Sequence, residues 1–284
     1  MSTIKYGNIT VYDEANPRFK MFRKYGRFPS NLTFGFEDEI VYNPANSGKR
    51  FNNKVEDLML QAPYLYLKEE ASNCGVELNS HPFNWSWFLA LMKHSRKDFI
   101  SELSTLRHPN DFYVNNECGF HIHLGKQFFT KEHLVKMVKF FYDKKNTKFL
   151  HKISKRTRNS FNEWSSPFVP KRERRVGNVW KNERYTFEQI ASFSPKRFND
   201  EMVDKACILN LYPKETIEIR MFKGTTNPVL FRAYLEFALA VSLFTKNASL
   251  NKVTIKNFKR FVKKNIGDYK NLYRLITKPK RLRV

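Results

Sequence analysis

The chain has 284 residues, of which 41% are hydrophobic and 15% aromatic, so it is too apolar to be disordered and long enough for one large α+β domain or two small ones. No apolar stretch approaches the roughly 20 residues of a membrane helix, and the first residues lack the apolar run of a signal peptide, so we expect a cytoplasmic protein without a membrane partner. The formal net charge of +24 favours partners that carry phosphate.

The positive charge is concentrated in two segments. Residues 144–184 carry a net charge of +10 and residues 251–284 a net charge of +11, which leaves +3 for the other 209 residues. Such patches attract the phosphates of nucleotides or of nucleic acid. Two solvated basic surfaces would give the same composition, so the charge alone leaves both interpretations open.

The first half of the chain predicts strands and helices after an irregular lead-in over residues 1–30. Residues 33–41 alternate as a strand does and end at an Asn-Pro pair. Residues 53–68 have a helical pattern that a proline interrupts. A second strand is expected over residues 74–79, followed by a helix over residues 85–103 with an apolar stripe.

The second half continues with three strands and several helices. We expect a strand over Gly119–Gly125 and an amphipathic helix that begins at Thr130. The basic segment of residues 144–184 has two prolines and is interpreted as a long loop or an elaborated insertion. Residues 206–212 and 216–222 then predict two strands joined as a hairpin.

The last part of the chain is predicted to be helical. Asn227 and Pro228 suit the N-cap and first position of a long apolar helix. A basic amphipathic helix follows from Thr254 and leads into a Lys/Arg tail. We therefore divide the chain into the lead-in, a main domain of residues 31–250 that contains the basic insertion, and a basic C-terminal segment of residues 251–284.

Strand alternation places unusual side chains together on one face. Neighbours two residues apart on a strand point the same way, so four of the predicted strands each have an apolar face and a face rich in carboxylate and imidazole. An ordinary open face would carry Lys, Thr, Ser and Gln. The residues on the polar face are Glu37, Glu39, Glu77, His121, His123, Glu218 and Arg220.

This composition predicts a metal site that binds ATP. Like charges on one face destabilise a sheet unless cations neutralise them. Carboxylate oxygens are the ligands that Mg²⁺ and Mn²⁺ prefer, and Mn²⁺ also accepts imidazole. A magnesium site can hold ATP because the metal bridges phosphate oxygens. The guanidinium of Arg220 suits a phosphate or a substrate carboxylate.

Each of these residues also has a simpler interpretation. A pair of glutamates on a strand is usually solvated, and Glu218 with Arg220 is most often a structural ion pair. Cys118, His121 and His123 could bind structural zinc, but no Cys-x-x-Cys pair accompanies them. The odd number of cysteines fits reduced thiols. The coincidence of four such strands is what favours an active site.

The motifs, in their order, resemble the amidoligase family, which is related to glutamine synthetase and gamma-glutamylcysteine ligase. They are Gly-x-Glu-x-Glu at Gly35–Glu39, Gly-x-Glu-x-x-Ser-x-Pro at Gly75–Pro82, Cys-Gly-x-His-x-His-x-Gly at Cys118–Gly125 and Glu-x-Arg-x-x-x-Gly-Thr at Glu218–Thr225. The resemblance spans roughly residues 33–245. The histidine motif and the Glu-x-Arg motif, in this order, are its most specific parts.

The resemblance implies a fold and a reaction. It implies an α+β fold like that of glutamine synthetase, in which an antiparallel sheet curves into a funnel with helices on its convex side and metal and ATP on its concave side. It also implies an ATP-dependent carboxylate–amine ligase that activates a carboxylate as an acyl phosphate and forms an amide or isopeptide bond with an amine. The substrates would be amino acids, peptides or proteins. Asp38 departs from this pattern because it puts a charge on the apolar side of the sheet.

Carried over by position, the resemblance gives each site residue a role. The metal ligands would be Glu37, Glu39, Glu77, His123 and Glu218. The nucleotide and its phosphates would be bound by Arg220, Lys223, Arg156 and Arg158. The catalytic residues would be Glu37, Arg220 and His121, with His121 as a partner of a ligand or of the substrate.

Two other functions remain open. A nucleic-acid-binding protein could use the same scaffold through its two basic patches, with non-specific affinity for nucleic acid. Aromatic residues interleaved with the basic ones include Phe161, Trp164, Phe168, Trp180 and Tyr185. A metal-dependent nuclease or phosphoesterase could use the same acidic cluster.

Overall fold

The computed structural model describes residues 3–6, 9–12, 21–42, 53, 62, 64–69, 75–94, 112–167, 171–176, 179–194, 197, 207–279 and 282. Its main element is an open ten-stranded sheet in the order β1-β2-β4-β5-β3-β8-β12-β11, with β6 and β7 also paired to β3. All of the pairs are antiparallel except that of β2 with β4. The strands are β1 Thr3–Tyr6, β2 Ile9–Tyr12, β3 Thr33–Tyr42, β4 Leu65–Glu69, β5 Gly75–Ser80, β6 Phe83–Asn84, β7 Phe112–Tyr113, β8 Gly119–Gly125, β11 Leu209–Asn210 and β12 Thr216–Lys223.

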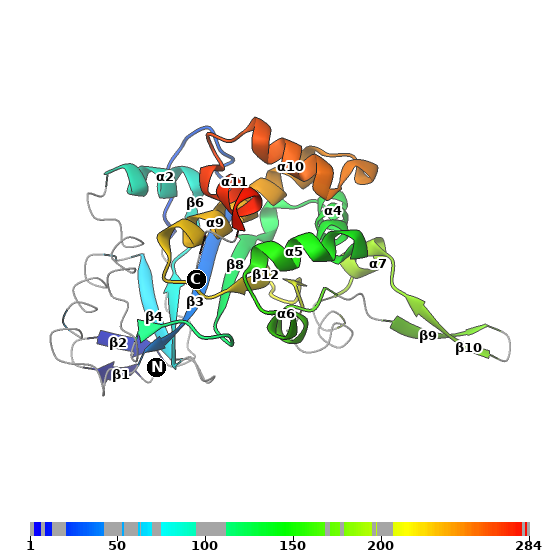
Figure 1. Ribbon diagram of the computed structural model, residues 1–284, viewed down its shortest axis with the longest axis horizontal. Helices are drawn as coiled ribbons and strands as arrows, with labels where there is room; N and C mark the ends of the chain where they lie inside the picture. Colours follow the sequence, from blue (N-terminus) through cyan, green and yellow to red (C-terminus); the bar gives the residue numbers. More distant parts are fainter. Residues whose placement is uncertain are drawn as a thin grey trace.

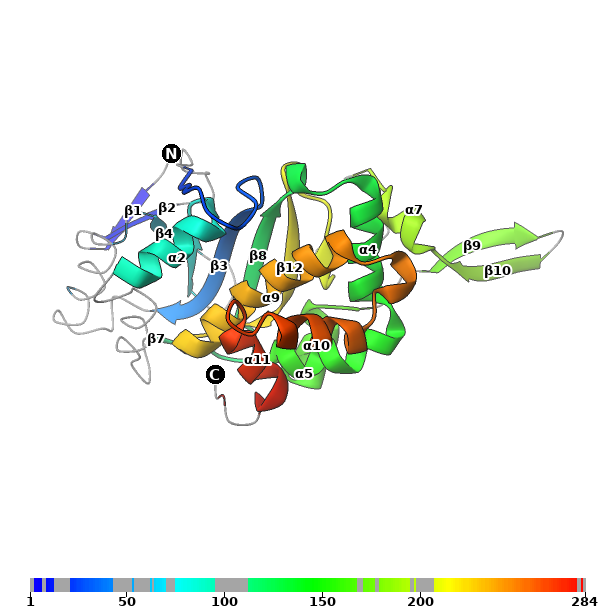
Figure 2. The same ribbon diagram turned by 90° about the horizontal axis from the view of Figure 1, so that it is seen from above.

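Helices α2, α9, α10 and α11 lie together on one side of this sheet (Figures 1 and 2). The mixture of helices and antiparallel strands agrees with the expected α+β class. The α-helices are α2 Trp85–His94, α4 Lys131–Tyr142, α5 Thr147–Ser154, α6 Arg158–Trp164, α7 Phe187–Ala191, α9 Pro228–Asn247, α10 Ile255–Lys264 and α11 Lys270–Thr277. The 3-10 turns are η1 Lys126–Phe128, η2 Lys144–Asn146 and η3 Leu250–Lys252.

Aromatic side chains join the central strands to helix α9. Phe36 of β3 stacks on Phe120 of β8 with ring centroids 5.7 Å apart. Phe231 of α9 packs edge-on against both rings, at 4.8 Å and 5.0 Å. These rings take one face of β3 and β8, so the alternate side chains of the same strands must point to the opposite face. The packing therefore fixes which face is left for polar groups.

Helix α9 begins as its sequence predicts. The side chain of Asn227 accepts hydrogen bonds from the backbone N–H groups of Val229 and Leu230, and Pro228 takes the first turn. Among the described residues, α9 is the one helix that is long and apolar enough to cross a membrane by length and composition. The expectation that the chain has no such stretch is therefore wrong. Most of α9 is buried in the core, which accounts for its apolar composition without a bilayer.

The strands expected over residues 33–41, 119–125 and 216–222 are confirmed as β3, β8 and β12. The strand expected over residues 74–79 is found as β5, although residue 74 lies outside the described residues. The hairpin partner expected over residues 206–212 is shorter, because only the two residues of β11 form a strand among residues 207–212, and residue 206 lies outside the described residues.

Two expectations for the N-terminal part are wrong for some of their residues, although residues 21–30 are irregular as expected. Residues expected to be an irregular lead-in form an antiparallel pair, β1 with β2. The helix expected over residues 53–68 is replaced at its C-terminal end by strand β4. Leu65 and Leu67 are buried while Tyr66 and Lys68 are half-buried, and this period of two is that of a strand. Residues 54–61 and 63 of that expected helix lie outside the described residues.

The basic parts of the chain contain regular secondary structure, which favours the elaborated insertion over the long loop for residues 144–184. The segment over residues 144–184 is not one long loop, because it forms α5, α6 and a hairpin of β9 (Lys171–Val176) with β10 (Val179–Arg184). This hairpin projects from the body of the molecule (Figures 1 and 2). The single basic C-terminal helix is instead two helices, α10 and α11. Helix α2 matches the first part of the helix expected over residues 85–103, whose residues 95–103 are not described.

Candidate functional site

The register of the three central strands aligns the polar side chains predicted from alternation. Glu37 of β3 lies opposite His121 of β8, and Glu218 of β12 lies opposite His123 of β8. Directly opposite residues in an antiparallel pair project to the same face. The two carboxylates therefore flank the two imidazoles across three adjacent strands, on the face away from Phe36 and α9.

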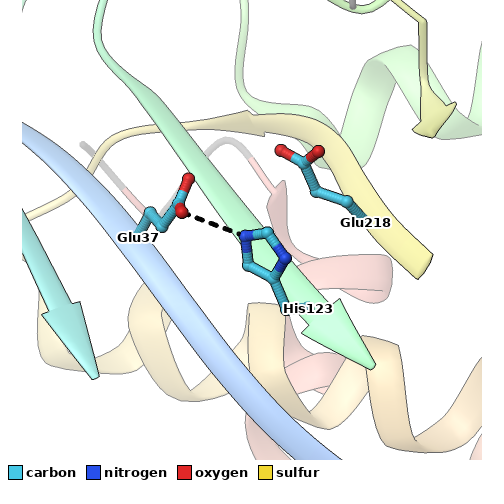
Figure 3. Close-up of side chains that lie close together, drawn as sticks. All are labelled: Glu37, His123 and Glu218. Carbon is cyan, nitrogen blue, oxygen red and sulfur yellow. Dashed lines mark ion pairs between the residues drawn. The ribbon is translucent and has the colours of Figure 1, made fainter. Parts of the chain in front are cut away.

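Glu37, His123 and Glu218 form a cluster that could hold a metal ion. One ligand atom from each of them lies within 4.8 Å of the others, and His123 Nε2 is 3.1 Å from Glu37 Oε1. Figure 3 shows the three side chains converging from their separate strands. Two carboxylates and one imidazole suit Mn²⁺, and the carboxylates with added water suit Mg²⁺. The donor set therefore fits the metals expected from the sequence.

His121 lies at the centre of the carboxylates. Its Nδ1 is 3.3 Å from Glu37 Oε2 and 3.5 Å from Glu218 Oε1, and its Nε2 is 3.6 Å from Glu39 Oε1. Because both ring nitrogens face carboxylate oxygens, the ring can orient three acidic side chains at once. This arrangement suits a residue that positions metal ligands.

The imidazole of His123 and the carboxylates of Glu37 and Glu218 favour each other's charged forms. Burial raises the pKa of Glu37, but the charge of His123 and hydrogen bonds from both histidines hold that pKa well below its ordinary value. Burial lowers the pKa of His123, yet Glu37 and Glu218 raise it to about 9. Near neutral pH, the proton on His123 therefore offsets part of the carboxylate charge, and a bound metal ion would take over this role as the proton leaves.

Glu39 and Arg156 meet at Gly119. The backbone N–H of Gly119 donates to Glu39 Oε2. A Cβ on Gly119 would lie 2.6 Å from His121 Nε2 and 2.7 Å from Arg156 Nη2. Burial lowers the pKa of Arg156 to about 10, although Glu39 raises it. Arg156 is thus a buried guanidinium beside the acidic cluster, whereas its predicted companion Arg158 lies exposed on α6.

The loop between α5 and α6 directs Arg156 inward. Lys155 precedes it with a left-handed backbone (φ 65°), which ends α5 abruptly. Arg156 Nη1 then donates to Ser160 Oγ at 3.1 Å, and Ser160 Oγ donates to the carbonyl of Asn116 at 2.9 Å. The loop between α5 and α6, which is not part of the sheet, therefore adds the guanidinium of Arg156 to the site.

Arg220 and Lys223 extend the basic side of the site along β12. Arg220 Nη1 donates to Glu218 Oε1, so the structural ion pair considered for these two residues does form. Burial lowers the pKa of Arg220, but Glu218 raises it above its ordinary value. Lys223 Nζ donates to Asn116 Oδ1 at 3.1 Å, and burial, together with the charge of Arg156, lowers its pKa, although Cys118 raises it.

The predicted ligand Glu77 and the unusual Asp38 both lie apart from the cluster. Glu77 is opposite Glu39 in the register, but its Oε2 accepts from Lys68 Nζ at 3.4 Å and from Asn79 Nδ2 at 3.3 Å. It does not join the three-residue group found among the described residues. Asp38 lies on the helix side, as expected, where its Oδ1 accepts the N–H of Thr225 at 3.0 Å. Its charge there anchors the turn before α9.

Sequence reasoning missed two polar residues that hold the cluster. Asn210 Nδ2 donates to Glu218 Oε2 at 2.8 Å from the opposite position on β11. Thr216 Oγ1 lies 3.3 Å from His123 Nδ1. Asn210 occurs in a predicted strand, so its pairing with Glu218 could have been found from the hairpin register. Thr216 carried no such signal, because threonine is common in strands.

Comparison with models of protein families gives a match. A family model described as "Putative amidoligase enzyme" matches residues 67–242, which is more than half of the chain. The matched region includes β5, β8, β12 and the loop that carries Arg156, whereas Glu37 and Glu39 precede it. No curated protein matches the chain.

Proposed function

The chain belongs to the amidoligase family, and on that basis we propose that it is an ATP-dependent carboxylate–amine ligase. The observation that carries the proposal is the cluster of Glu37, His123 and Glu218, whose ligand atoms lie within 4.8 Å of one another. Arg220 and Arg156 flank this cluster, and the charge of Arg220 contributes to lowering the pKa of Arg156. A divalent cation beside two guanidinium groups is an arrangement suited to a polyphosphate.

The proposed reaction has two steps. An oxygen of the substrate carboxylate attacks the γ-phosphorus of ATP, and ADP leaves with the electron pair of the broken P–O bond. The nitrogen of an amine then attacks the acyl carbon, phosphate leaves, and the nitrogen loses a proton to give an amide or isopeptide bond. The carboxylate and the amine would come from amino acids, peptides or proteins.

The residues of the site have separate roles in this reaction. A bound Mg²⁺ or Mn²⁺ would supply charge neutralisation for the phosphates. Glu37, His123 and Glu218 are its proposed ligands, with Glu39 beside them. His121 orients the carboxylates. The remaining stabilisation comes from fixed positive charge and needs no covalent enzyme nucleophile.

Arg220 and Arg156 are the proposed contacts to the phosphoryl group that is transferred, and Lys223 is a proposed third contact. We further propose that the sheet is the funnel of a glutamine-synthetase-like fold. The support for this is that α9 and its neighbours cover one face while the charged cluster occupies the other.

The proposal predicts that ATP binds only together with Mg²⁺ or Mn²⁺. Without a cation, the carboxylates at positions 37, 39 and 218 repel the nucleotide phosphates. Calorimetric titration should show ATP binding in excess Mg²⁺ and at least about a tenfold weaker affinity in EDTA. Equal affinity in the two conditions would contradict the role of the cluster.

The same preparation separates the ligase from a phosphoesterase or nuclease. A ligase should release ADP and phosphate from ATP, and a mixture of amino acids or peptides should increase this release. A phosphoesterase should cleave a simple phosphate ester, and a nuclease should cleave DNA or RNA, both with metal but without ATP. Cleavage of either substrate without ATP turnover would overturn the assignment.

A further inference from the structure

Exposed lysines and arginines cover one group of neighbouring helices at the surface of the molecule. They come from two stretches of the sequence, η2 with α5 and α10 with α11. The exposed residues are Lys144, Lys145, Lys148, Lys152, Lys256, Lys259, Arg260, Lys263, Lys264, Lys270 and Arg274. We call them together the basic helix surface.

The two stretches form one surface because α5 and α10 pack against each other. Phe149 of α5 and Phe258 of α10 have ring centroids 6.2 Å apart. Lys259 Nζ lies 5.1 Å from the centre of the Phe149 ring. At the end of α5, Lys155 Nζ donates to the carbonyl of Pro279 at 3.0 Å. The positive charges that composition places in two separate segments are therefore neighbours in space.

Carboxylates do not neutralise this surface. Residues 144–155 contain no acidic residue, and residues 252–278 contain only Asp268, which pairs with Arg27. Within the part of the chain that the structure describes, no ion pair involves a lysine or arginine of the basic helix surface. Such a concentration of like charge favours binding of a polyanion.

We propose that the basic helix surface binds double-stranded nucleic acid through its phosphates. A duplex presents closely spaced negative charges along a rigid rod, which suits a surface built on several packed helices. The binding would be largely independent of base sequence, since the exposed groups are lysines and arginines that contact phosphates.

The fold argues against an anionic membrane as the partner. A basic amphipathic helix such as α10 can bind a membrane by burying its apolar side among the lipids. Here that side is already in the protein core. Phe258 and Val262 are fully buried, and Phe261 packs on Phe244 at 5.8 Å. The positive charge of α10 is therefore available to a partner while its apolar face is not.

The fold also argues against a single strand bound by base stacking. Phe161 and Tyr185, two of the aromatic residues interleaved with the basic insertion, are buried. Phe168 and the side chain of Trp180 lie outside what the structure describes. Trp164 is exposed, but it is on α6 and not on the basic helix surface. Stacking platforms need exposed rings, and the basic helix surface has none fully exposed.

The test uses the full chain and a fluorescent DNA duplex of random sequence, about 20 base pairs long, with fluorescence anisotropy as the readout. The affinity should fall steeply between about 50 and 200 mM salt. The variant Lys256→Gln/Arg260→Gln/Lys263→Gln removes three exposed charges from α10. It should lower the affinity at least about tenfold and reduce the slope of log K against log salt by about 3, since each lost phosphate contact removes about 0.9.

A matched variant controls for net charge. Lys93→Gln/Lys131→Gln/Lys214→Gln removes three exposed lysines that lie outside the surface, and its affinity should stay within about twofold of the original. Melting temperatures should show that both variants fold, and ATP turnover should be unchanged in both. Equal weakening by the two variants would overturn the assignment to this surface. Equal or tighter binding of a single strand, of polyglutamate or of anionic vesicles would overturn the assignment to a duplex.

Discussion

Glu218 has a second task besides the proposed metal contact. Its two oxygens accept from Arg220 Nη1 and from Asn210 Nδ2, and Oε1 also lies 3.5 Å from His121 Nδ1. The ionised form is favoured, because Arg220 and the histidines lower the pKa that burial alone would raise. A change at this position should therefore affect both the site and the stability of the sheet.

Substitution of Glu218→Gln tests this double role. The amide keeps the shape but loses the charge, so metal affinity should fall at least about tenfold and ATP turnover should be abolished. The free energy of unfolding should fall by about 1–3 kcal/mol, because Arg220 loses a charged acceptor. Calorimetry, phosphate release and denaturant unfolding measure the three effects.

Substitution of Arg220→Lys is the companion variant. It keeps the positive charge next to Glu218 and loses the planar fork, so metal affinity should persist while turnover falls at least about tenfold. If the two residues formed only a structural ion pair, both variants would lose stability. Turnover per folded molecule would then be unchanged in each, and the active-site assignment would be wrong.

Gly119 offers a test that adds no charge. A methyl group there would lie within 3.2 Å of side-chain atoms of Glu39, His121 and Arg156. Gly119→Ala should therefore displace them, weaken metal binding and lower the free energy of unfolding by about 1–3 kcal/mol. Gly267→Ala is the matched control, because a Cβ at that position meets nothing within 4 Å. It should change the free energy by less than about 0.5 kcal/mol.

An unaltered metal affinity in Gly119→Ala, measured by calorimetry, would show that Glu39, His121 and Arg156 do not act together on the site. Equal destabilisation in Gly119→Ala and Gly267→Ala would contradict the crowding at Gly119.

Strand alternation predicted the cluster but could not show which of the polar residues belong to it. It identified Glu37, His123 and Glu218 because each lies in a clear strand. It could not separate Glu77 from them, since Lys68, the partner of Glu77, lies in a segment whose sequence has a helical pattern. The position of Arg156 had no periodic signal, because a loop outside the sheet brings it to the cluster.

Strand β12 shows why strict alternation fails to predict which face of the sheet every side chain occupies. Ile219 pairs with Ile122 and Phe222 with Phe120, so β12 has one residue more than β8 between these two pairs. Phe222 is therefore turned into the core, where it stacks on Tyr234 at 4.1 Å. A regular strand would have placed Phe222 on the polar face. The irregularity needs the partner strand to be known, so the sequence alone could not reveal it.

Helix α4 is joined to α9 by a buried histidine that should make stability depend on pH. His133 Nε2 lies 2.9 Å from Thr245 Oγ1, and its ring packs on Phe129 at 4.6 Å. Burial lowers the pKa of His133 to about 4, against an ordinary value near 6.5. Between these two pH values the unfolded chain binds more protons than the folded one, so stability falls as the pH drops from about 6.5 to 4.

The variant His133→Gln isolates this effect. Glutamine can keep the hydrogen bond to Thr245 but does not titrate. The original protein should lose about 2 kcal/mol more than the variant between pH 7 and pH 4, as measured by urea unfolding. Parallel stability curves for the two proteins over this range would show that another group is responsible.

At the scale of the whole molecule, the elements were easier to predict than their arrangement. Strand alternation predicted β3, β8 and β12, and capping predicted the start of α9. The order of the strands depends on contacts between residues far apart in the sequence, which local patterns do not encode. The N-terminal pair β1 and β2 was missed because four-residue strands give too short a pattern to recognise.

The arrangement of the positive charge also depends on contacts between residues that are far apart in the sequence. Composition located two basic segments, but only the packing of α5 against α10 shows that they form one surface. The acidic cluster and the basic helix surface then use different parts of one compact fold. A ligand on one of them does not have to displace a ligand from the other.

The burial of α9 has a consequence for protein synthesis. Strands β8 and β12, which cover its inner side, leave the ribosome before it, whereas α10 and α11 follow. Until they emerge, Phe237 and Phe244 lack the ring of Phe258 of α10, against which they pack at 5.7 Å and 5.6 Å. In a nascent chain that ends soon after Asn247, the side of α9 that faces α10 is therefore still exposed to solvent. The basic C-terminal helices are therefore the last elements to be synthesised that pack against α9.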